Sequence, residues 1–141
     1  MPSELQENEA VDNYAGNETI LLVEDNDMVR EMTTELMKGL GYTLHVAASP
    51  DQALEMIRNL PERIDLLISD VVMPGMNGRQ LFVKLKEERH EIEKVLYISG
   101  YNNIVSDITL EDGEHFLPKP FTPDAFMKKV RELLNTGLLA A

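Results

Sequence analysis

The sequence predicts an α/β fold: a doubly wound sheet of five parallel strands with five helices packed on its two faces. Short apolar runs alternate with longer amphipathic stretches along the chain, and several of the runs are apolar at successive positions. Successive apolar positions are typical of strands that are covered on both faces, as parallel strands are. The repeated alternation of strand and helix predicts βαβ units with right-handed crossovers.

Five short apolar runs are the expected strands of this sheet. They span residues 19–23, 43–47, 65–69, 95–99 and 115–117. The third run, "DLLIS", is followed directly by Asp70, so a carboxylate stands at the end of a strand built for the interior. The position of this charge calls for a functional explanation, because isolated charges are costly to bury.

Amphipathic spacing predicts the first helix. It is expected to begin with Asp27 as its N-cap and to end at Gly39 or Gly41. The apolar residues that recur at helical spacing are Val29, Met32, Leu36 and Leu40. They form the stripe expected to pack against the sheet.

Start signals mark the later helices. A Ser or Thr cap followed by proline at residues 49–50 and 122–123 opens two of them. Residues 77–89 form a third, with its apolar residues on one side. The segment 102–114 has few apolar residues, so the helix expected there is short.

Composition narrows the class of protein. A length of 141 residues is that of one ordinary domain, and we expect an acidic tail or linker over residues 1–17, the folded domain over 18–136 and a short C-terminal end over 137–141. The net charge of -12 argues against binding to nucleic acid. The absence of cysteine excludes disulfides and thiolate metal sites. No signal peptide or membrane-spanning stretch is recognised, so we expect a cytoplasmic protein without membrane contact.

Polar residues gather where the expected strands end. In a doubly wound sheet, ligands bind beyond the carboxyl ends of the strands, so residues that follow different strands are expected at one site. These residues are Glu24 and Asp25 after the first strand, Asp70 after the third, Ser99 at the end of the fourth and Lys119 after the fifth. Each alone is compatible with ordinary loop capping. Their joint occurrence predicts one functional site.

With this set in this order, the chain resembles the receiver domain of two-component response regulators over roughly residues 19–135. The resemblance implies a CheY-like, flavodoxin-like sheet with strand order 2-1-3-4-5. It implies that Asp70 is the phosphoacceptor and that Glu24 and Asp25 are the acidic pair that holds Mg²⁺. Ser99 and Phe116 take the switch positions, and Lys119 corresponds to the invariant-type lysine of the family.

Physical chemistry supports the same roles. Crowded carboxylates repel each other, so a hard divalent cation is expected among them, and Mg²⁺ fits best. Asp25 and Asp70 can bind it directly, with the backbone carbonyl of Val72 as a third protein ligand and Glu24 acting through water. The ion lets an anionic carboxylate attack an anionic phosphoryl donor. Lys119 and the Ser99 hydroxyl can then contact the phosphoryl oxygens.

The resemblance also implies the partners. A histidine kinase or histidine phosphotransfer protein would donate the phosphoryl group, and a downstream protein would bind the face formed by the fourth helix, fifth strand and fifth helix. The chain would be a phosphoacceptor with self-catalysed phosphorylation and autodephosphorylation rather than a metabolic enzyme. The chain would be either a stand-alone receiver or a receiver cut from a longer chain, and the phrases "YISGY" and "FLPKPFTP" resemble receivers of hybrid histidine kinases. Apolar Val72 and bulky Tyr101 predict slow autodephosphorylation, because they can screen the phosphoryl group from water.

Three alternatives stand beside this interpretation. An aspartyl-nucleophile, Mg²⁺-dependent phosphatase of the haloacid-dehalogenase type needs a second Asp two residues after the first, where this chain has Val72. A flavodoxin-like nucleotide binder needs a phosphate loop rich in glycine or hydroxyls after the first strand, where "EDND" would repel phosphate. A structural receiver that is never phosphorylated remains open, although the intact residue set argues against it.

Overall fold

The computed structural model describes residues 14–99, 110, 113–118 and 121–140, with the backbone alone at Ser99 and at 136–140. The five expected strands are present as β1 (Thr19–Val23), β2 (Thr43–Ala47), β3 (Leu66–Asp70), β4 (Val95–Ser99) and β5 (Glu114–Pro118). They pair in parallel in the order β2-β1-β3-β4-β5, which confirms the doubly wound topology. Asp70 is the last residue of β3, so this strand lies one residue later than predicted.

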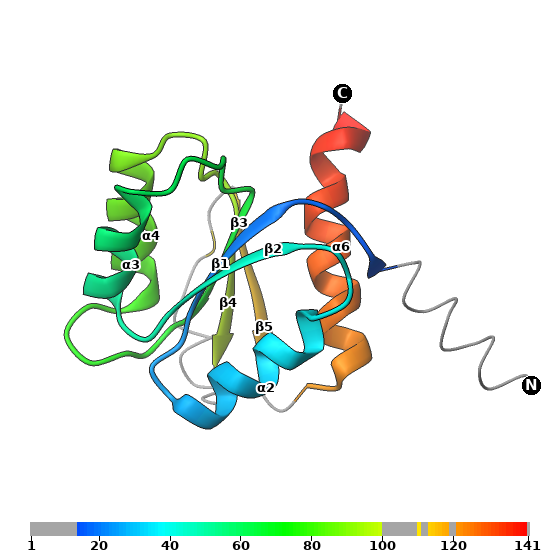
Figure 1. Ribbon diagram of the computed structural model, residues 1–141, viewed down its shortest axis with the longest axis horizontal. Coiled ribbons are helices and arrows are strands. Elements are labelled where there is room, and N and C mark those ends of the chain that lie inside the picture. The colour runs from blue at the N-terminus through cyan, green and yellow to red at the C-terminus, as the bar shows by residue number, and fades with distance from the viewer. Residues whose placement is uncertain (1–13, 100–109, 111–112, 119–120, 141) are drawn as a thin grey trace, which may run out of the picture.

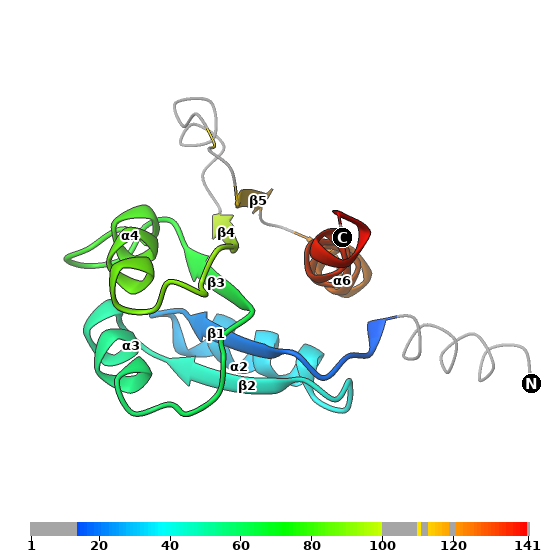
Figure 2. The same cartoon turned by 90° about the horizontal axis from the view of Figure 1, so that it is seen from above.

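Helices cover both faces of the sheet. The described part of the chain contains α2 (Asp27–Met37), α3 (Pro50–Ile57), α4 (Gly78–Glu88) and α6 (Pro123–Ala140). In Figures 1 and 2, α3 and α4 lie on one side of the sheet and α6 on the other. The helix expected over 102–114 falls largely outside the described residues, and the assignment of its last residue was wrong, because Glu114 begins β5. Among the described helices, none combines the length and apolarity that a membrane span requires.

The core consists of two apolar clusters, one on each face of the sheet. Leu21 of β1 and Tyr97 of β4 belong to the cluster beneath α3 and α4, whereas Ile20 belongs with Phe126 to the cluster beneath α2 and α6. Neighbouring residues of a strand point to opposite faces. Every residue of β1 is buried for this reason, which explains the unbroken apolar run in the sequence.

The first helix differs from its prediction in two details. Asn26, not Asp27, is the N-cap, because its side-chain oxygen accepts a hydrogen bond of 3.0 Å from the Val29 amide. Asp27 is instead the first helical residue. Met32 was expected to be buried but is 51% exposed, whereas Thr33 is fully buried. The Thr33 hydroxyl donates to the carbonyl of Val29, so this polar side chain can face the sheet, and Met32 points about 100° away.

The other helix starts are confirmed. The Ser49 hydroxyl accepts from the amide of Gln52, and the Thr122 hydroxyl accepts from the amide of Ala125. At the start of α4, Asn77 forms a full capping box with Gln80. These bonds satisfy backbone amides that the first turn of a helix would otherwise leave without partners.

The folded part of the chain reaches upstream to Tyr14, within the segment that composition assigned to a tail. The Tyr14 hydroxyl donates to Asp124 at 2.7 Å, and Arg131 of α6 donates to the carbonyl of Ala15 at 3.0 Å. Residues 1–13 of that segment lie outside the described residues.

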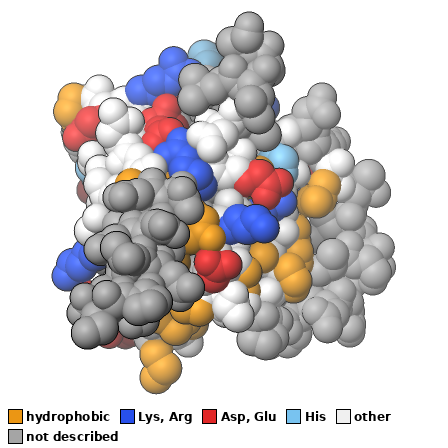
Figure 3. Space-filling model, turned by 90° about the vertical axis from the view of Figure 1, so that its right-hand side faces the viewer, with side chains coloured by type: hydrophobic (Ala, Val, Ile, Leu, Met, Phe, Trp, Pro, Cys, Tyr) orange, Lys and Arg blue, Asp and Glu red, His pale blue; other side chains and the backbone are white. Residues whose placement is uncertain are grey.

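The face seen in Figure 3 places acidic and basic side chains next to one another, which fits ion pairing better than a surface for phosphate backbones.

Glu18 and Arg131 form an ion pair that joins β1 to α6. Burial alone would raise the pKa of the Glu18 carboxyl, but hydrogen bonds from Arg131 and from backbone amides outweigh burial and hold this pKa below its usual 4.5. The unfolded chain therefore binds this proton more readily than the folded one. The resulting stabilisation is fully present above about pH 4.5 and is lost as the pH falls through the lower pKa of the folded state.

We expect Arg131→Gln to lower the free energy of unfolding by about 2 kcal/mol near neutral pH, because several hydrogen bonds to a charged group are lost. The deficit should shrink as urea denaturation is repeated at pH values progressively below 4.5, because protonation of Glu18 in the folded state removes the charge that Arg131 binds. Arg58→Gln, at an exposed pair with Glu88, is the control and should cost roughly 0.5 kcal/mol or less. A deficit at Arg131 that does not depend on pH would contradict this account.

Candidate functional site

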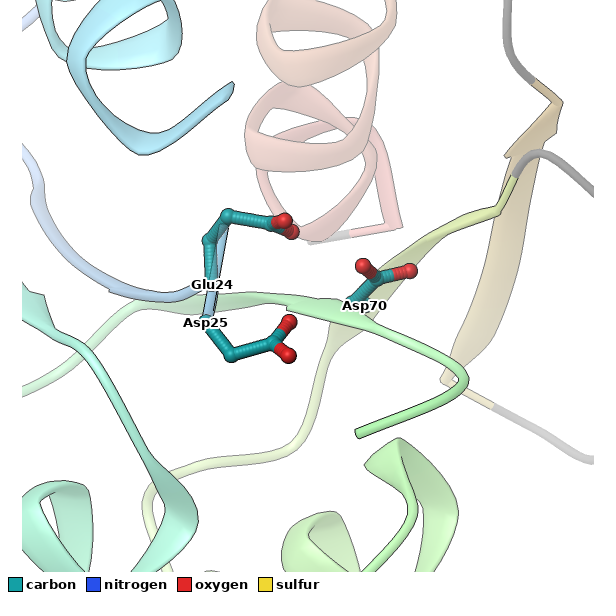
Figure 4. Close-up of side chains that lie close together, drawn as sticks. All are labelled: Glu24, Asp25 and Asp70. Carbon is teal, nitrogen blue, oxygen red and sulfur yellow. The ribbon is translucent and has the colours of Figure 1, made fainter. Parts of the chain in front are cut away.

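Three acidic side chains meet at the carboxyl end of the sheet. Glu24 and Asp25 follow β1, and Asp70 ends β3, which pairs directly with β1. One carboxylate oxygen from each residue lies within 4.8 Å of the others. Figure 4 shows the three carboxylates directed into one common space. The predicted acidic cluster is thus brought together by the fold.

The cluster fits a divalent cation. Its donors are hard carboxylate oxygens, the ligand type that Mg²⁺ prefers. One oxygen from each residue lies within 4.8 Å of the others, so the three residues would be the ones to hold such a cation. Two like charges at this distance repel by about 3 kcal/mol at an effective dielectric constant of about 20. A bound dication would attract each carboxylate and so offset the repulsion between them.

The three carboxylates differ in their access to solvent. Glu24 is fully buried, Asp70 is partly buried and Asp25 is exposed. Its position after a central strand keeps Glu24 inside, where one of its carboxylate oxygens accepts a hydrogen bond from the Asn26 amide at 3.3 Å. The open side of the cluster is therefore the Asp25 and Asp70 side, where a second molecule can approach.

The loop after Asp70 depends on a close contact at Gly78. The Gly78 amide donates to the carbonyl of Val71 at 2.9 Å. A Cβ atom on Gly78 would lie 2.3 Å from the backbone oxygen of Asp70. Glycine at the first position of α4 thus lets this helix start directly against the strand end that carries the phosphoacceptor candidate.

We expect Gly78→Ala to lower the free energy of unfolding by about 1–3 kcal/mol, the usual cost of overpacking a tight contact. In a helix without such a contact, the same change would stabilise by about 1 kcal/mol, so the sign of the effect is diagnostic. Urea denaturation measures it. An unchanged or raised stability would show that α4 does not need its close approach to Asp70.

The remaining predicted site residues are described unevenly. Ser99 ends β4 as expected, but its side chain lies outside the described atoms, and so does all of Lys119. Phe116 lies on β5 in register with Tyr97 and packs, partly buried, against the α3 and α4 cluster. Val72 is 49% exposed in the loop after Asp70. The roles of these residues therefore stay predictions.

Sequence reasoning missed a buried polar network beside α4. The Glu114 carboxylate accepts from Arg79 Nε at 2.9 Å and from the Tyr97 hydroxyl at 2.5 Å. Burial, and next the hydrogen bond to Glu114, raise the pKa of the Tyr97 phenol, so that it stays a donor. The signal in the sequence was Glu114 itself, an acidic residue beside an apolar strand. Its partners Arg79 and Tyr97 lie 35 and 17 positions away, so the sequence did not connect them.

Sequence reasoning also missed Arg30. Its guanidinium donates from Nη1 to the backbone carbonyl of Glu24 at 3.0 Å, beside the acidic cluster. The signal was a basic residue close to the start of a helix, where the helix dipole disfavours positive charge. Such a position calls for a specific partner.

The fold and the site together define the class of protein. It is a doubly wound α/β protein whose acidic cluster lies between β1 and β3, the topological switch point of this strand order. The chain belongs to the response regulator receiver domain family, which its sequence matches over residues 20–131. It is thus a receiver domain of two-component signalling, as the sequence indicated.

Individual relatives agree. The chain is 37% identical over 129 residues to the sensor kinase CckA of Brucella abortus (strain 2308), covering 90% of this chain and 14% of the kinase. The solved receiver domain of the hybrid histidine kinase CckA is 36% identical, with a TM-score of 0.69 and coverage of 82% of this chain and 98% of that one. The response regulator TrrA of Thermotoga maritima, solved in complex with Mg²⁺-BeF, is 26% identical with a TM-score of 0.69, and the same shares of the two chains are covered.

These matches concern the receiver part of longer proteins. The chain spans 14% of the length of CckA and about half of the length of other curated relatives that it matches. Receiver domains are phosphoacceptors rather than ordinary enzymes, and they interact with histidine kinases or phosphotransfer proteins. Family membership therefore fixes the type of signalling module.

Proposed function

We propose that this chain is the phosphoacceptor receiver of a two-component phosphorelay, in which Asp70 takes a phosphoryl group from a phosphohistidine with the help of Mg²⁺. The observation that carries the proposal is the cluster of Glu24, Asp25 and Asp70 at the β1 and β3 strand ends, within a chain of the receiver family. The TrrA relative solved with Mg²⁺-BeF supports it, because Mg²⁺ accompanies the bound group in that protein.

The chain's own residues have distinct tasks. Glu24, Asp25 and Asp70 would hold Mg²⁺, together with the backbone carbonyl of Val72. When bound, the ion neutralises charge on the phosphoryl oxygens. A carboxylate oxygen of Asp70 then forms a bond to phosphorus while the bond from phosphorus to the donor imidazole nitrogen breaks. The products are an aspartyl phosphate and a free histidine.

The switch follows from the added charge. Phosphorylation brings about -1.5 to -2 charges and strong acceptor oxygens to Asp70. We propose that Lys119 and the Ser99 hydroxyl contact these oxygens and that Phe116 repacks as the loop after β4 moves. A downstream protein would then read the face that includes β5 and α6.

Phosphorylation by acetyl phosphate tests the proposal. Intact mass after incubation with acetyl phosphate and Mg²⁺ should show one added phosphoryl group, and Asp70→Asn should abolish it. Asp51→Asn, at an exposed aspartate in the first turn of α3, is the matched control and should be phosphorylated normally. Equal phosphorylation of the Asp70 variant would overturn the proposal, and steady turnover of added phosphoesters would favour the aspartyl phosphatase.

Val72→Asn should shorten the half-life of the aspartyl phosphate by about tenfold, which corresponds to about 1.4 kcal/mol in the barrier to hydrolysis. We propose that the exposed apolar side chain of Val72, two residues after Asp70, would keep water away from the phosphoryl group, whereas an amide can hydrogen-bond an attacking water. Loss of phosphoryl mass over time measures the rate. Val83→Asn, 51% exposed on α4, is the control, and equal half-lives for both variants and the parent would sink the idea.

A further inference from the structure

We propose that Arg30 is a positioning residue that holds the metal-binding carboxylates of the β1–α2 loop, an inference that rests on the function proposed above. Its Nη1 donates to the backbone carbonyl of Glu24 at 3.0 Å, and its Nη2 donates to the Asp27 carboxylate at 2.5 Å. The Arg30 side chain is only 21% exposed. One guanidinium thus joins the residue that follows β1 to the first turn of α2.

The segment spanned by this guanidinium carries the acidic pair. Asp25 and Asn26 are the two residues between the anchored positions Glu24 and Asp27. Asn26 is tied at both ends, since its amide donates to the Glu24 carboxylate and its side chain accepts from the Val29 amide. Arg30 adds a further contact to this loop through its hydrogen bond to the Glu24 carbonyl. The orientations of the Glu24 and Asp25 side chains depend on this backbone.

Charge alone argues against an arginine at this place. A positive group near the start of a helix opposes the helix dipole, and near a cation site it repels the ion. The planar fork of the guanidinium can, however, reach two acceptors at once, which a lysine ammonium cannot do with the same geometry. Asp27, 83% exposed, partly neutralises the charge. Geometry and charge therefore predict opposite effects of removing Arg30.

A Mg²⁺ titration followed by backbone amide shifts decides between them. If Arg30 acts by position, both Arg30→Lys and Arg30→Gln should weaken Mg²⁺ binding by about tenfold, the lower end of the cost of losing an outer contact at a metal site. If it acts by charge, Arg30→Gln should bind more tightly and Arg30→Lys should bind as the parent does, which would overturn the inference. Arg58→Lys, far from the site in an ion pair with Glu88, is the matched control.

A second readout needs no metal. Hydrogen exchange of the amides of residues 24–29 in the metal-free protein should be faster in Arg30→Lys than in the parent, with exchange in β3 unchanged. Equal exchange in the two proteins would overturn the inference even if Mg²⁺ binding differed.

The two hypotheses fail in distinguishable ways. If the parent shows no saturable Mg²⁺ response, or one that survives Asp25→Asn, the proposed function fails. If the parent response depends on Asp25 while the Arg30 variants match the parent, only the role of Arg30 fails.

Discussion

Replacing Asp25 with asparagine should weaken Mg²⁺ binding by about 100-fold and slow phosphorylation of Asp70 at least as much, since a charged ligand is lost. In protein stripped of divalent cations, the same change should raise the free energy of unfolding by about 1 kcal/mol, because one of three mutually repelling carboxylates is removed and its exposure screens part of the repulsion. Urea denaturation with EDTA measures the change in the stability of the metal-free protein. The gain in stability with excess Mg²⁺ reports the change in Mg²⁺ binding.

Asp25→Asn should thus weaken Mg²⁺ binding but raise the stability of the metal-free protein, and these opposite signs make it a sharp test of the acidic cluster. Asp51→Asn carries the same change in charge at an exposed position outside the cluster, so it should alter neither Mg²⁺ binding nor the response of stability to Mg²⁺. If Asp25→Asn lowered the stability of the metal-free protein, the Asp25 carboxylate would stabilise the fold. It would not be a metal ligand that is repelled by its neighbours when the ion is absent.

Glu114→Ala should lower the free energy of unfolding by about 2 kcal/mol, because hydrogen bonds from Tyr97 and from the partly exposed Arg79 to a buried charged group are lost. The Glu114 side chain is 3% exposed and joins Arg79 of α4 to Tyr97 of β4, so its removal takes a carboxylate from two donors at once. Glu114→Gln keeps an acceptor and should cost less. Urea denaturation at neutral pH provides the comparison.

The control for this network is an exposed ion pair of the same residue types. Glu88 pairs with Arg58 between α3 and α4 at 3.0 Å, with side chains 36% and 61% exposed. Glu88→Ala should cost roughly 0.5 kcal/mol or less, as surface pairs do. A loss at Glu114 no larger than that at Glu88 would mean that the buried network adds nothing beyond a surface contact.

The sequence predicted the strands and most helix starts because these depend on local signals. The unbroken apolar run of β1 and the Ser49 cap of α3 need no knowledge of distant residues. The cap at Asn26 was assigned to Asp27 because both residue types cap helices well, and one position decides which oxygen reaches the Val29 amide. Met32 was predicted to be buried because its side chain is apolar, whereas the neighbouring Thr33 is polar and was not counted in the apolar stripe.

The acidic cluster was predictable, whereas its supports were not. The carboxyl ends of parallel strands meet at one edge of the sheet, so Asp25 and Asp70 had to lie close once β1 and β3 were recognised as strands. No comparable rule connects Glu114 to Arg79, or Arg131 to Ala15, because those contacts depend on how helices pack on the finished sheet. Tertiary packing therefore sets the residues that hold the site, and strand topology sets the site itself.

The dependence of Asp70 phosphorylation on Mg²⁺ tests the central claim most directly. Initial rates with acetyl phosphate, followed by intact mass over a range of Mg²⁺ concentrations, should rise to saturation and fall by about 100-fold or more when EDTA removes the ion. Phosphorylation of Asp70 at the same rate with and without Mg²⁺ would show that the clustered carboxylates do not work through a shared cation.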